Sequence, residues 1–204
     1  MKKIFFTMVM LAITPVVSRA ELVLGRSLAD AQSGAALNMN LGAAETLEIW
    51  AIGATDQNIR ALSFNLTAAT PGVVNSTALA FDDLGGRWPL NNTTFDLLGQ
   101  SASGLLIDDA QIATFGNFAG TGVTFTATEP AIRLGTLDVS ADSAGSSLLN
   151  FSAGSNGVND QTGAISGFAV GGRTLNVISA VPEPSSAALI AIGAAGFVIR
   201  RRRR

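Results

Sequence analysis

The chain of 204 residues contains no cysteine, no histidine and no tyrosine. Without cysteine, neither a disulfide framework nor a thiolate nucleophile can be built. Without histidine, the commonest general base and the commonest transition-metal ligand are both missing. Zinc sites of the usual kind and nucleophilic triads are therefore excluded, and we expect a protein without a cofactor that is not an enzyme.

Lysine is nearly absent as well, because Lys2 and Lys3 are the only two in the chain. Between Glu21 and Ala180 there are fourteen Asp and Glu residues against five Arg, so this part has a net charge of about −9. The whole-chain value of −2 hides this acidity, since the other basic residues lie near the two ends. An acidic body repels phosphate backbones, so nucleic acid is not an expected partner.

Residues 1–20 have the pattern of a secretory signal peptide. Two lysines precede the mostly apolar stretch Ile4–Val17, and the small residues Ser18 and Ala20 stand at positions −3 and −1 before Glu21. The apolar stretch is shorter than the ~20 residues that span a bilayer. We therefore predict export and cleavage by signal peptidase before Glu21, with an uncleaved anchor helix as the alternative.

The C-terminus combines three elements in a fixed order. The box Pro182-Glu183-Pro184 comes first, the uncharged apolar run Ala187–Ile199 follows, and the chain ends in Arg200, Arg201, Arg202, Arg203 and Arg204. Proline disfavours helix in the residues before it, so a helix can begin only after the box. Thirteen apolar residues span about 20 Å as a helix, against ~30 Å of hydrocarbon. The arginines favour the cytoplasmic side, which places the body on the outer side.

These residues resemble the PEP-CTERM sorting signal. The resemblance implies recognition by an exosortase-like membrane protease, cleavage near the box, a transient stay in the inner membrane and transfer to the cell surface or beyond. It also implies a bacterium that makes exopolysaccharide. A plain tail anchor is the alternative. We divide the chain into residues 1–20 as signal peptide, 21–180 as body and 181–204 as sorting tail.

The body alternates short β-rich runs with clusters of Gly, Pro, Asn and Asp. Leu62, Phe64 and Leu66 alternate with polar residues, which is typical of a half-buried strand. Further strands are predicted at Leu37–Leu41, Thr46–Ile52, Ala78–Phe81, Ile112–Phe118, Val123–Thr128, Ile132–Val139, Leu148–Phe151, Ile165–Val170 and Thr174–Ile178. Ala29–Ala36 fits either a helical turn or a loop. Nine or ten strands without intervening helices favour an all-β, antiparallel sandwich or barrel.

The strand pattern of the body also resembles cohesin-like modules and carbohydrate-binding sandwiches. The similarity lies in Leu47–Ile52, Ile59–Leu66, Arg133–Val139 and Asn176–Ile178. It implies a jelly-roll core in which Leu62–Leu66 pairs with Leu134–Val139. Because only strand patterns match, no binding residue is transferred.

Two adjacent carboxylate pairs, Asp82-Asp83 and Asp108-Asp109, are candidates for acid–base catalysis. Neighbouring residues on a strand point to opposite faces, so neither pair is itself a catalytic dyad. Both pairs lie near glycine-containing loops, where aspartate is common for its turn chemistry. A structural role is therefore favoured over catalysis.

The stretch Gly154–Gly163 contains Asn156, Asn159 and Asp160, whose oxygens are of the kind that calcium prefers. The spacing does not fit an EF-hand, and a hairpin loop is the favoured alternative.

The two tryptophans differ in their surroundings. Trp50 lies in an apolar run and is expected in the core, whereas Trp88 lies in a loop and is the candidate for ligand contact. Three functions stay open: a structural or adhesive surface protein associated with exopolysaccharide, a glycan- or protein-binding module of cohesin-like type, and a secreted hydrolase with a carboxylate site.

Overall fold

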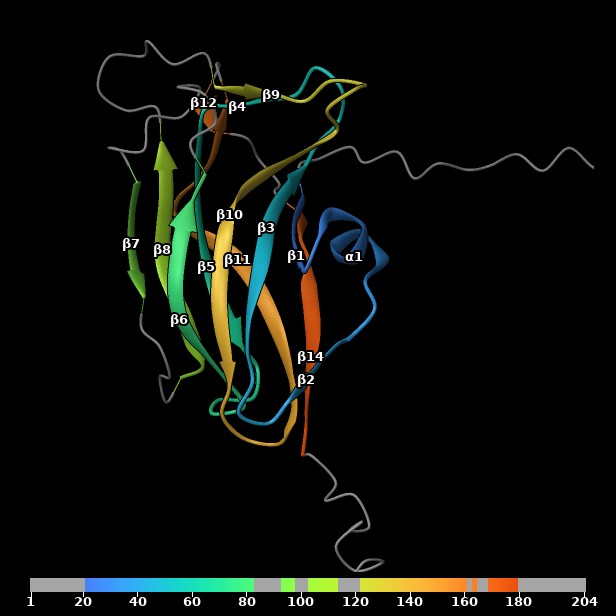
Figure 1. Cartoon of the computed structure of the whole chain (residues 1–204). Helices are drawn as coiled ribbons and strands as arrows, with labels where there is room; N and C mark the ends of the chain where they lie inside the picture. Colours follow the sequence, from blue (N-terminus) through green and yellow to red (C-terminus); the bar gives the residue numbers. More distant parts are fainter. Residues whose placement is uncertain are drawn as a thin grey trace, which may run out of the picture.

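Two β-sheets pack face to face, with one short helix at their side (Figure 1). The computed structural model describes residues 21–82, 93–97, 103–113, 122–160, 163–164 and 169–179. The predicted all-β sandwich is confirmed, and most strand pairs are antiparallel, as expected.

Sheet A has five strands in the order β13-β1-β3-β10-β6. Their bounds are β13 Ala169–Val170, β1 Glu21–Gly25, β3 Ala44–Ile52, β10 Ala131–Ala141 and β6 Val74–Phe81. The β1–β13 pair is parallel, while the other pairs in this sheet are antiparallel. The first strand of the body thus lies beside a strand from its C-terminal part.

Sheet B has the order β2-β14-β11-β5-β8-β7, with β12 paired to the end of β11. Their bounds are β2 Leu37–Asn40, β14 Gly172–Ile178, β11 Gly145–Asp160, β5 Ala61–Ala68, β8 Leu105–Ala113, β7 Thr93–Leu97 and β12 Gly163–Ala164. Here the β14–β2 pair is parallel. A separate pair, β4 (Asn58–Ile59) with β9 (Val123–Thr124), lies at the upper end in Figure 1.

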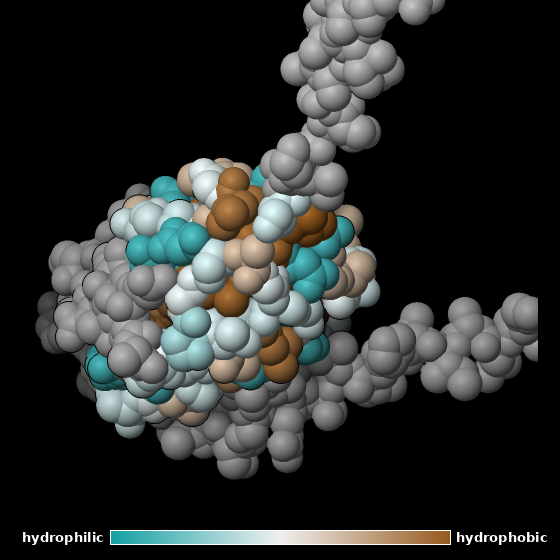
Figure 2. All heavy atoms as spheres, turned by 90° about the horizontal axis from the view of Figure 1, so that it is seen from below, coloured by the Kyte–Doolittle hydropathy of each residue, from teal (hydrophilic) through white to brown (hydrophobic). Residues whose placement is uncertain are grey.

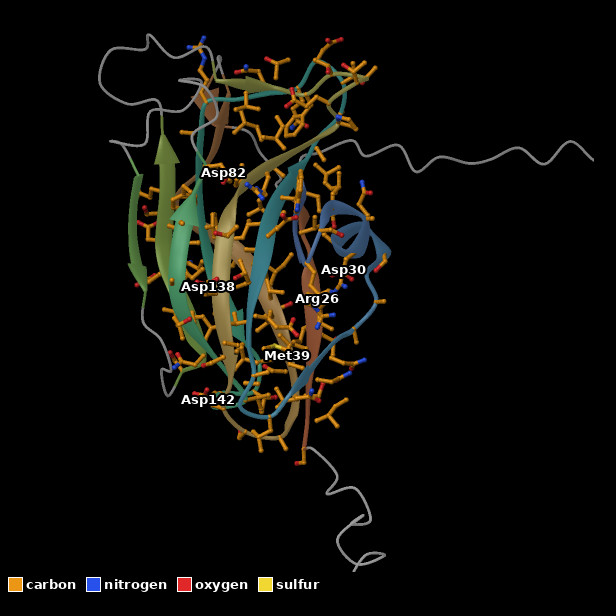
Figure 3. All side chains as sticks on the ribbon, viewed as in Figure 1. Arg26, Asp30, Met39, Asp82, Asp138 and Asp142 are labelled. Atoms are coloured by element: carbon orange, nitrogen blue, oxygen red, sulfur yellow. The ribbon has the colours of Figure 1, made fainter. Side chains whose placement is uncertain are left out.

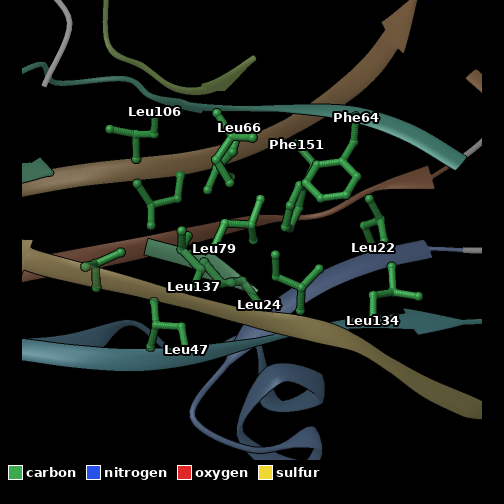
Figure 4. Close-up of a cluster of buried hydrophobic side chains, with 14 of the residues drawn as sticks. Leu22, Leu24, Leu47, Phe64, Leu66, Leu79, Leu106, Leu134, Leu137 and Phe151 are labelled. Atoms are coloured by element: carbon green, nitrogen blue, oxygen red, sulfur yellow. The ribbon is translucent and has the colours of Figure 1, made fainter. Parts of the chain in front are cut away.

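The core forms between the sheets because apolar residues alternate with polar ones along the strands. On β5, Phe64 and Leu66 are fully buried, whereas Asn65 between them is half-buried and faces outward. Figure 4 shows the leucines and phenylalanines that meet in this layer. Phe64 and Phe151 pack edge to face with ring centroids 5.4 Å apart.

The stretch that fitted a helical turn or a loop, Ala29–Ala36, overlaps α1, Leu28–Ser33. Ser27 caps it by accepting a hydrogen bond from the Asp30 backbone N–H, and Gly34 ends it with a φ of 64°. The guanidinium of Arg173 on β14, which is only 3% exposed, donates to the backbone carbonyl oxygens of Asp30 and Ala31. It also forms an ion pair with the Asp30 carboxylate at 2.7 Å.

Several strand boundaries were wrong. The strand expected at Ile112–Phe118 is the end of β8, which begins at Leu105, and residues 114–121 lie outside the described residues. The strand expected at Val123–Thr128 ends at Thr124, because Thr126 and Glu129 exchange backbone hydrogen bonds in a turn before Pro130. The strand β1 was not predicted, since it follows the apolar signal region without a break.

The strand pairing inferred from the cohesin-like resemblance was also wrong. Leu62–Leu66 belongs to β5 in sheet B, and Leu134–Val139 belongs to β10 in sheet A. The two runs share one apolar core, but their backbones are not hydrogen-bonded partners.

Candidate functional site

A hydrogen-bonded polar cluster lies on the outer face of sheet B, where three adjacent strands meet. Strand alternation on β5 turns Asn65 outward. The register of β8 shifts between the partners of Phe64 and Leu66, and Asp109 in this bulge has a φ of 43°. A second register shift, on β11 after Ala153, positions Ser155. Two bulges thus bring side chains together that regular strands would hold apart.

The contacts within this cluster are short and reciprocal. The Asn65 side chain accepts from the Asp109 backbone N–H at 2.7 Å and donates to the Ala153 carbonyl at 3.3 Å. The Asp109 carboxylate accepts from the Ser155 backbone N–H at 2.8 Å and from the Ser155 hydroxyl at 2.7 Å. It also accepts from the Gln111 side-chain amide. We call Asn65, Asp109, Gln111 and Ser155 the polar cluster.

Gly154 is required for this arrangement. A Cβ atom at this position would lie 2.5 Å from an Asp109 carboxylate oxygen and 2.9 Å from the Ser63 hydroxyl oxygen. Real Cβ atoms do not approach that closely, so any other residue at position 154 would displace the Asp109 carboxylate.

Hydrogen bonds from the Ser155 hydroxyl and backbone N–H lower the pKa of Asp109, with a further contribution from Gln111 and an opposing one from burial. A non-glycine residue at positive φ is strained, and such residues are enriched at ligand contacts and active sites. The structure therefore places an ionised, oriented carboxylate on the outer face of sheet B.

We expect Asp109→Asn to weaken folding in a pH-dependent way. Asparagine tolerates positive φ but carries no charge for Ser155 to stabilise. Because the folded-state pKa is lowered, the contribution of the carboxylate is present above the ordinary value of ~3.9 and is lost as pH falls through the folded-state value. At pH 7 the variant should lose about 1 kcal/mol or less, since the site is partly exposed. Urea unfolding from pH 2 to 7 should give curves that converge at the acid end, and a constant difference would contradict this assignment.

Amide and hydroxyl side chains line much of the rest of this face. Asn38 of β2 and Asn176 of β14 are paired in register and joined by a side-chain hydrogen bond of 3.1 Å. Asn150 and Ser152 of β11 stand opposite Thr67 and Asn65 of β5. Amide and hydroxyl groups can donate and accept, so this face can form many hydrogen bonds without losing charge solvation.

Sheet A carries a different cluster on its outer face, toward the viewer around Asp82 in Figure 3. Arg133 donates to Asp82 at 2.6 Å and to Glu48 at 3.0 Å, and the Trp50 indole N–H donates to Glu48 at 3.0 Å. Asp82 and then Glu48 raise the pKa of Arg133 through these hydrogen bonds. The expectation that Trp50 is a core residue was wrong, because inward positions on β3 are Leu47, Ile49 and Ala51, and Trp50 is a half-buried outward residue between them.

The predicted carboxylate pairs do not come together as a catalytic site among the described residues. Asp82 is an ion-pair partner of Arg133, and Asp108 lies on β8 opposite Asp96 of β7. Within the described ranges, no three Asp or Glu residues are grouped so that they could hold a metal ion. Asp109 was predicted as half of a pair, but its partners are Asn65, Gln111 and Ser155.

The stretch with the calcium candidates Asn156, Asn159 and Asp160 is mainly strand, because β11 continues to Asp160. Asn159 and Asp160 pair antiparallel with β12, so they are strand residues and not part of the hairpin loop that was the favoured alternative. Calcium binding there stays a prediction.

Most of the other candidates lie outside the described residues. These are Ser18, Ala20, Asp83, Trp88, Pro182, Glu183, Pro184 and Arg200–Arg204. Glu21, the predicted first residue of the mature protein, is the first residue of β1. No helix in the described part of the chain has the length and apolar character to cross a bilayer.

Comparison with known families identifies a motif in the C-terminal segment. Residues 180–204 match the PEP-CTERM protein-sorting motif. The resemblance inferred from the box, the apolar run and the arginines is thereby confirmed. No curated protein matches the chain.

Comparison with solved structures identifies the fold of the body. The sandwich is cohesin-like. A non-cellulosomal cohesin from Archaeoglobus fulgidus is 14% identical, with a TM-score of 0.51 over 79% of this chain and 93% of that one. A type I cohesin from Pseudobacteroides cellulosolvens is 16% identical, with a TM-score of 0.51 over 81% and 96%. A type I cohesin–dockerin complex from Clostridium thermocellum contributes a chain that is 10% identical, with a TM-score of 0.54 over 79% and 100%. At these identities the likeness establishes the fold alone.

Proposed function

We propose that the chain is an exported, non-enzymatic surface protein whose sandwich binds a protein partner through the outer face of sheet B. The observation that carries this proposal is the polar cluster, in which Asp109, at a positive φ, is held by Ser155 and Asn65 on the outer face of sheet B. The cohesin-like fold supports it, because solved structures with this fold include complexes with dockerins.

Delivery to the surface follows from the two ends of the chain. Signal peptidase removes residues 1–20, and the apolar run Ala187–Ile199 with its arginines holds the body at the outer side of the inner membrane. An exosortase-like protease then cuts near Pro182-Glu183-Pro184 and releases the body to the cell surface. The sorting motif at residues 180–204 supports this route.

The outer face of sheet B suits a protein partner better than a small molecule. Its hydrogen-bonding groups extend from Asn38 on β2 to Gln111 on β8, so they cover the width of the sheet rather than converging on one point. A specific protein interface buries about 800 Å² per partner, which needs a surface of this extent. Asp109 supplies one fixed charge that can orient a partner carrying Lys or Arg.

The test is surface crosslinking with matched variants. A photoreactive residue is placed at exposed Asn40 on β2, and cells that display the protein are irradiated. Ser152→Arg adds bulk opposite Asn65, while Ala78→Arg makes the same change at an exposed position of sheet A. We expect Ser152→Arg to reduce the crosslinked adduct about tenfold, or 1.4 kcal/mol of binding, with little effect of Ala78→Arg. Equal adduct in both variants would overturn the proposal.

A second candidate function is binding of exopolysaccharide, and it rests on a different face. Trp50 offers a partly exposed indole beside Arg133, Glu48 and Asp82, which combines an apolar surface with fixed hydrogen-bonding groups. Cosedimentation with purified exopolysaccharide that is lost in Trp50→Ala would favour this function over the protein-binding one.

A further inference from the structure

The end of the sandwich from which the chain leaves toward its sorting tail is one continuous surface. It is formed by the β2–β3 turn, the β5–β6 turn, the β10–β11 turn and the last residues of β14, at the lower end in Figure 1. We call residues 41–43, 70–73, 142–144 and 178–179 the basal surface.

Backbone hydrogen bonds join these four segments. The Leu41 N–H donates to the Ile178 carbonyl at 2.9 Å, and the Gly42 N–H donates to the Ala141 carbonyl at 2.8 Å. The Asp142 N–H donates to the Val73 carbonyl at 3.0 Å. The basal surface is therefore held as a unit.

The basal surface is poor in charge for so acidic a protein. Asp142 is its single charged residue, and its carboxylate accepts from the Ser140 hydroxyl at 2.7 Å. The opposite end of the sandwich carries Asp56 and Glu129 next to β4 and β9. Charged groups lose hydration when a surface approaches a bilayer, and this loss costs free energy. Because the basal surface carries only one charge, this cost is small.

The basal surface also exposes aliphatic side chains. Among the described residues, Leu41, Leu148 and Ile178 are the large hydrophobic residues classed as exposed, at 44%, 39% and 49%. Leu41 and Ile178 lie side by side on the basal surface. Leu148 faces outward on β11 opposite Thr174, about 13 Å farther up β14 at 3.3 Å per residue. Figure 2, which views this end, shows hydrophobic atoms gathered around the point where the chain leaves.

The length of the connecting chain brings this end close to the membrane. Only residues 179–186 lie between Ile178 and the apolar run that begins at Ala187. Eight residues span at most about 29 Å, and the headgroup layer takes up ~5–7 Å of that distance. A tether this short gives a local concentration in the millimolar range, so even a weak contact is populated.

We propose that, while the tail is inserted, the basal surface rests on the outer side of the inner membrane with Leu41 and Ile178 in the lipid headgroup layer. This inference rests on the proposed insertion of the sorting tail. The contact fixes the sandwich upright, so that both sheet faces stay open and the processing box is held at the membrane.

The test uses the full chain in vesicles of phosphatidylethanolamine and phosphatidylglycerol. The chain has no cysteine, so Ala144→Cys gives a unique labelling site on the basal surface for a fluorophore, and lipids with a headgroup nitroxide serve as quencher. We expect strong quenching that falls at least threefold, about 0.65 kcal/mol at RT ≈ 0.59 kcal/mol, when Leu41→Asp and Ile178→Asp are combined. Leu148→Asp is the matched control and should leave the quenching unchanged.

Leu41→Ser with Ile178→Ser serves as a milder pair, in case the aspartates disturb the fold. Carbonate extraction tests the insertion of the tail separately from the membrane contact of the basal surface. A chain that stays in the vesicles without quenching overturns the membrane contact alone, whereas a chain that is extracted overturns the proposed insertion as well. Quenching that does not respond to either double variant also overturns the inference. Quenching that appears only with a co-reconstituted processing protease would make the occupant a protein instead of lipid.

Discussion

Replacing Arg173 by methionine should lower the free energy of unfolding of the body by about 3 kcal/mol, because it removes a buried guanidinium that pairs with Asp30 and donates to two carbonyl oxygens of α1. Arg173 is 3% exposed, and its guanidinium joins β14 to both the carboxylate of Asp30 and the carbonyls of Asp30 and Ala31 in α1. Its loss removes the buried donor to the Asp30 carboxylate and to the Asp30 and Ala31 carbonyls, which keep only their contacts with the Arg26 N–H, the Ser33 hydroxyl and the Gly34 N–H among the described residues. Urea unfolding of residues 21–180, followed by circular dichroism, measures the change.

Arg26→Met is the matched control for this prediction. Arg26 also pairs with a carboxylate, that of Glu45 at 2.8 Å, but its side chain is 45% exposed. Water solvates both charges when an exposed ion pair is broken, so the expected loss in the free energy of unfolding is below about 1 kcal/mol. Figure 3 shows Arg26 and Asp30 near the helix on the same side of the molecule. If both variants lost the same stability, burial of Arg173 would not be the cause.

The fold was predictable from the sequence because strand alternation is a local signal. Leu62, Phe64 and Leu66 were assigned to one buried face from their spacing alone, and the structure confirms it. Trp50 was misplaced because a run of apolar residues hides which of them face outward. Side chains alternate between the two faces along β3. Because the charged Glu48 must face outward, Leu47 and Ile49 face inward and Trp50 faces outward.

The polar cluster was less accessible to sequence reasoning for a physical reason. Asp109 lies 44 residues from Asn65 and 46 residues from Ser155, and the three meet only through two register shifts. Bulges have no strong sequence signature beyond a glycine or an aspartate that tolerates unusual φ. Gly154 and the Asp108-Asp109 pair were both visible in the sequence. Their proximity depends on the long-range pairing of β8, β5 and β11, which alternation cannot specify.

The sorting tail follows the basal surface after only a few residues of the chain. The box at Pro182 begins four residues after Ile178, so a folded body and a membrane-embedded protease must approach within about 14 Å of extended chain. The basal surface, which is the charge-poor end of the sandwich, is the end nearest to this protease. The acidic residues near β4 and β9 and the Asp109 cluster are thereby kept away from an anionic lipid surface, where they would be repelled.

Substituting Glu183 by alanine should leave export intact and leave the full-length chain in the inner membrane. Proline disfavours helix in the residues before it, and Glu183 between the two prolines is the only charge between the body and the arginines in the sequence. Thirteen apolar residues are too few to span a bilayer comfortably even as a helix, and mismatch costs fractions of a kcal/mol per Å, so a segment of this length suits a transient anchor. We expect at least about a tenfold fall in the body-sized fragment, or 1.4 kcal/mol of lost recognition. Ser186→Ala, three residues farther on, should be processed normally.

Replacing Arg200–Arg204 by glutamine should produce a different defect from the one at the box. The arginines resist crossing, so without them the uncleaved chain should escape outward instead of accumulating in the membrane. Fractionation of strains with and without an exosortase, with an epitope in the body, separates these outcomes. Body-sized fragments in equal amounts in both strains would refute exosortase-dependent sorting. Full-length protein retained in both membranes would instead establish a permanent tail anchor, and the proposed release of the sandwich would be wrong.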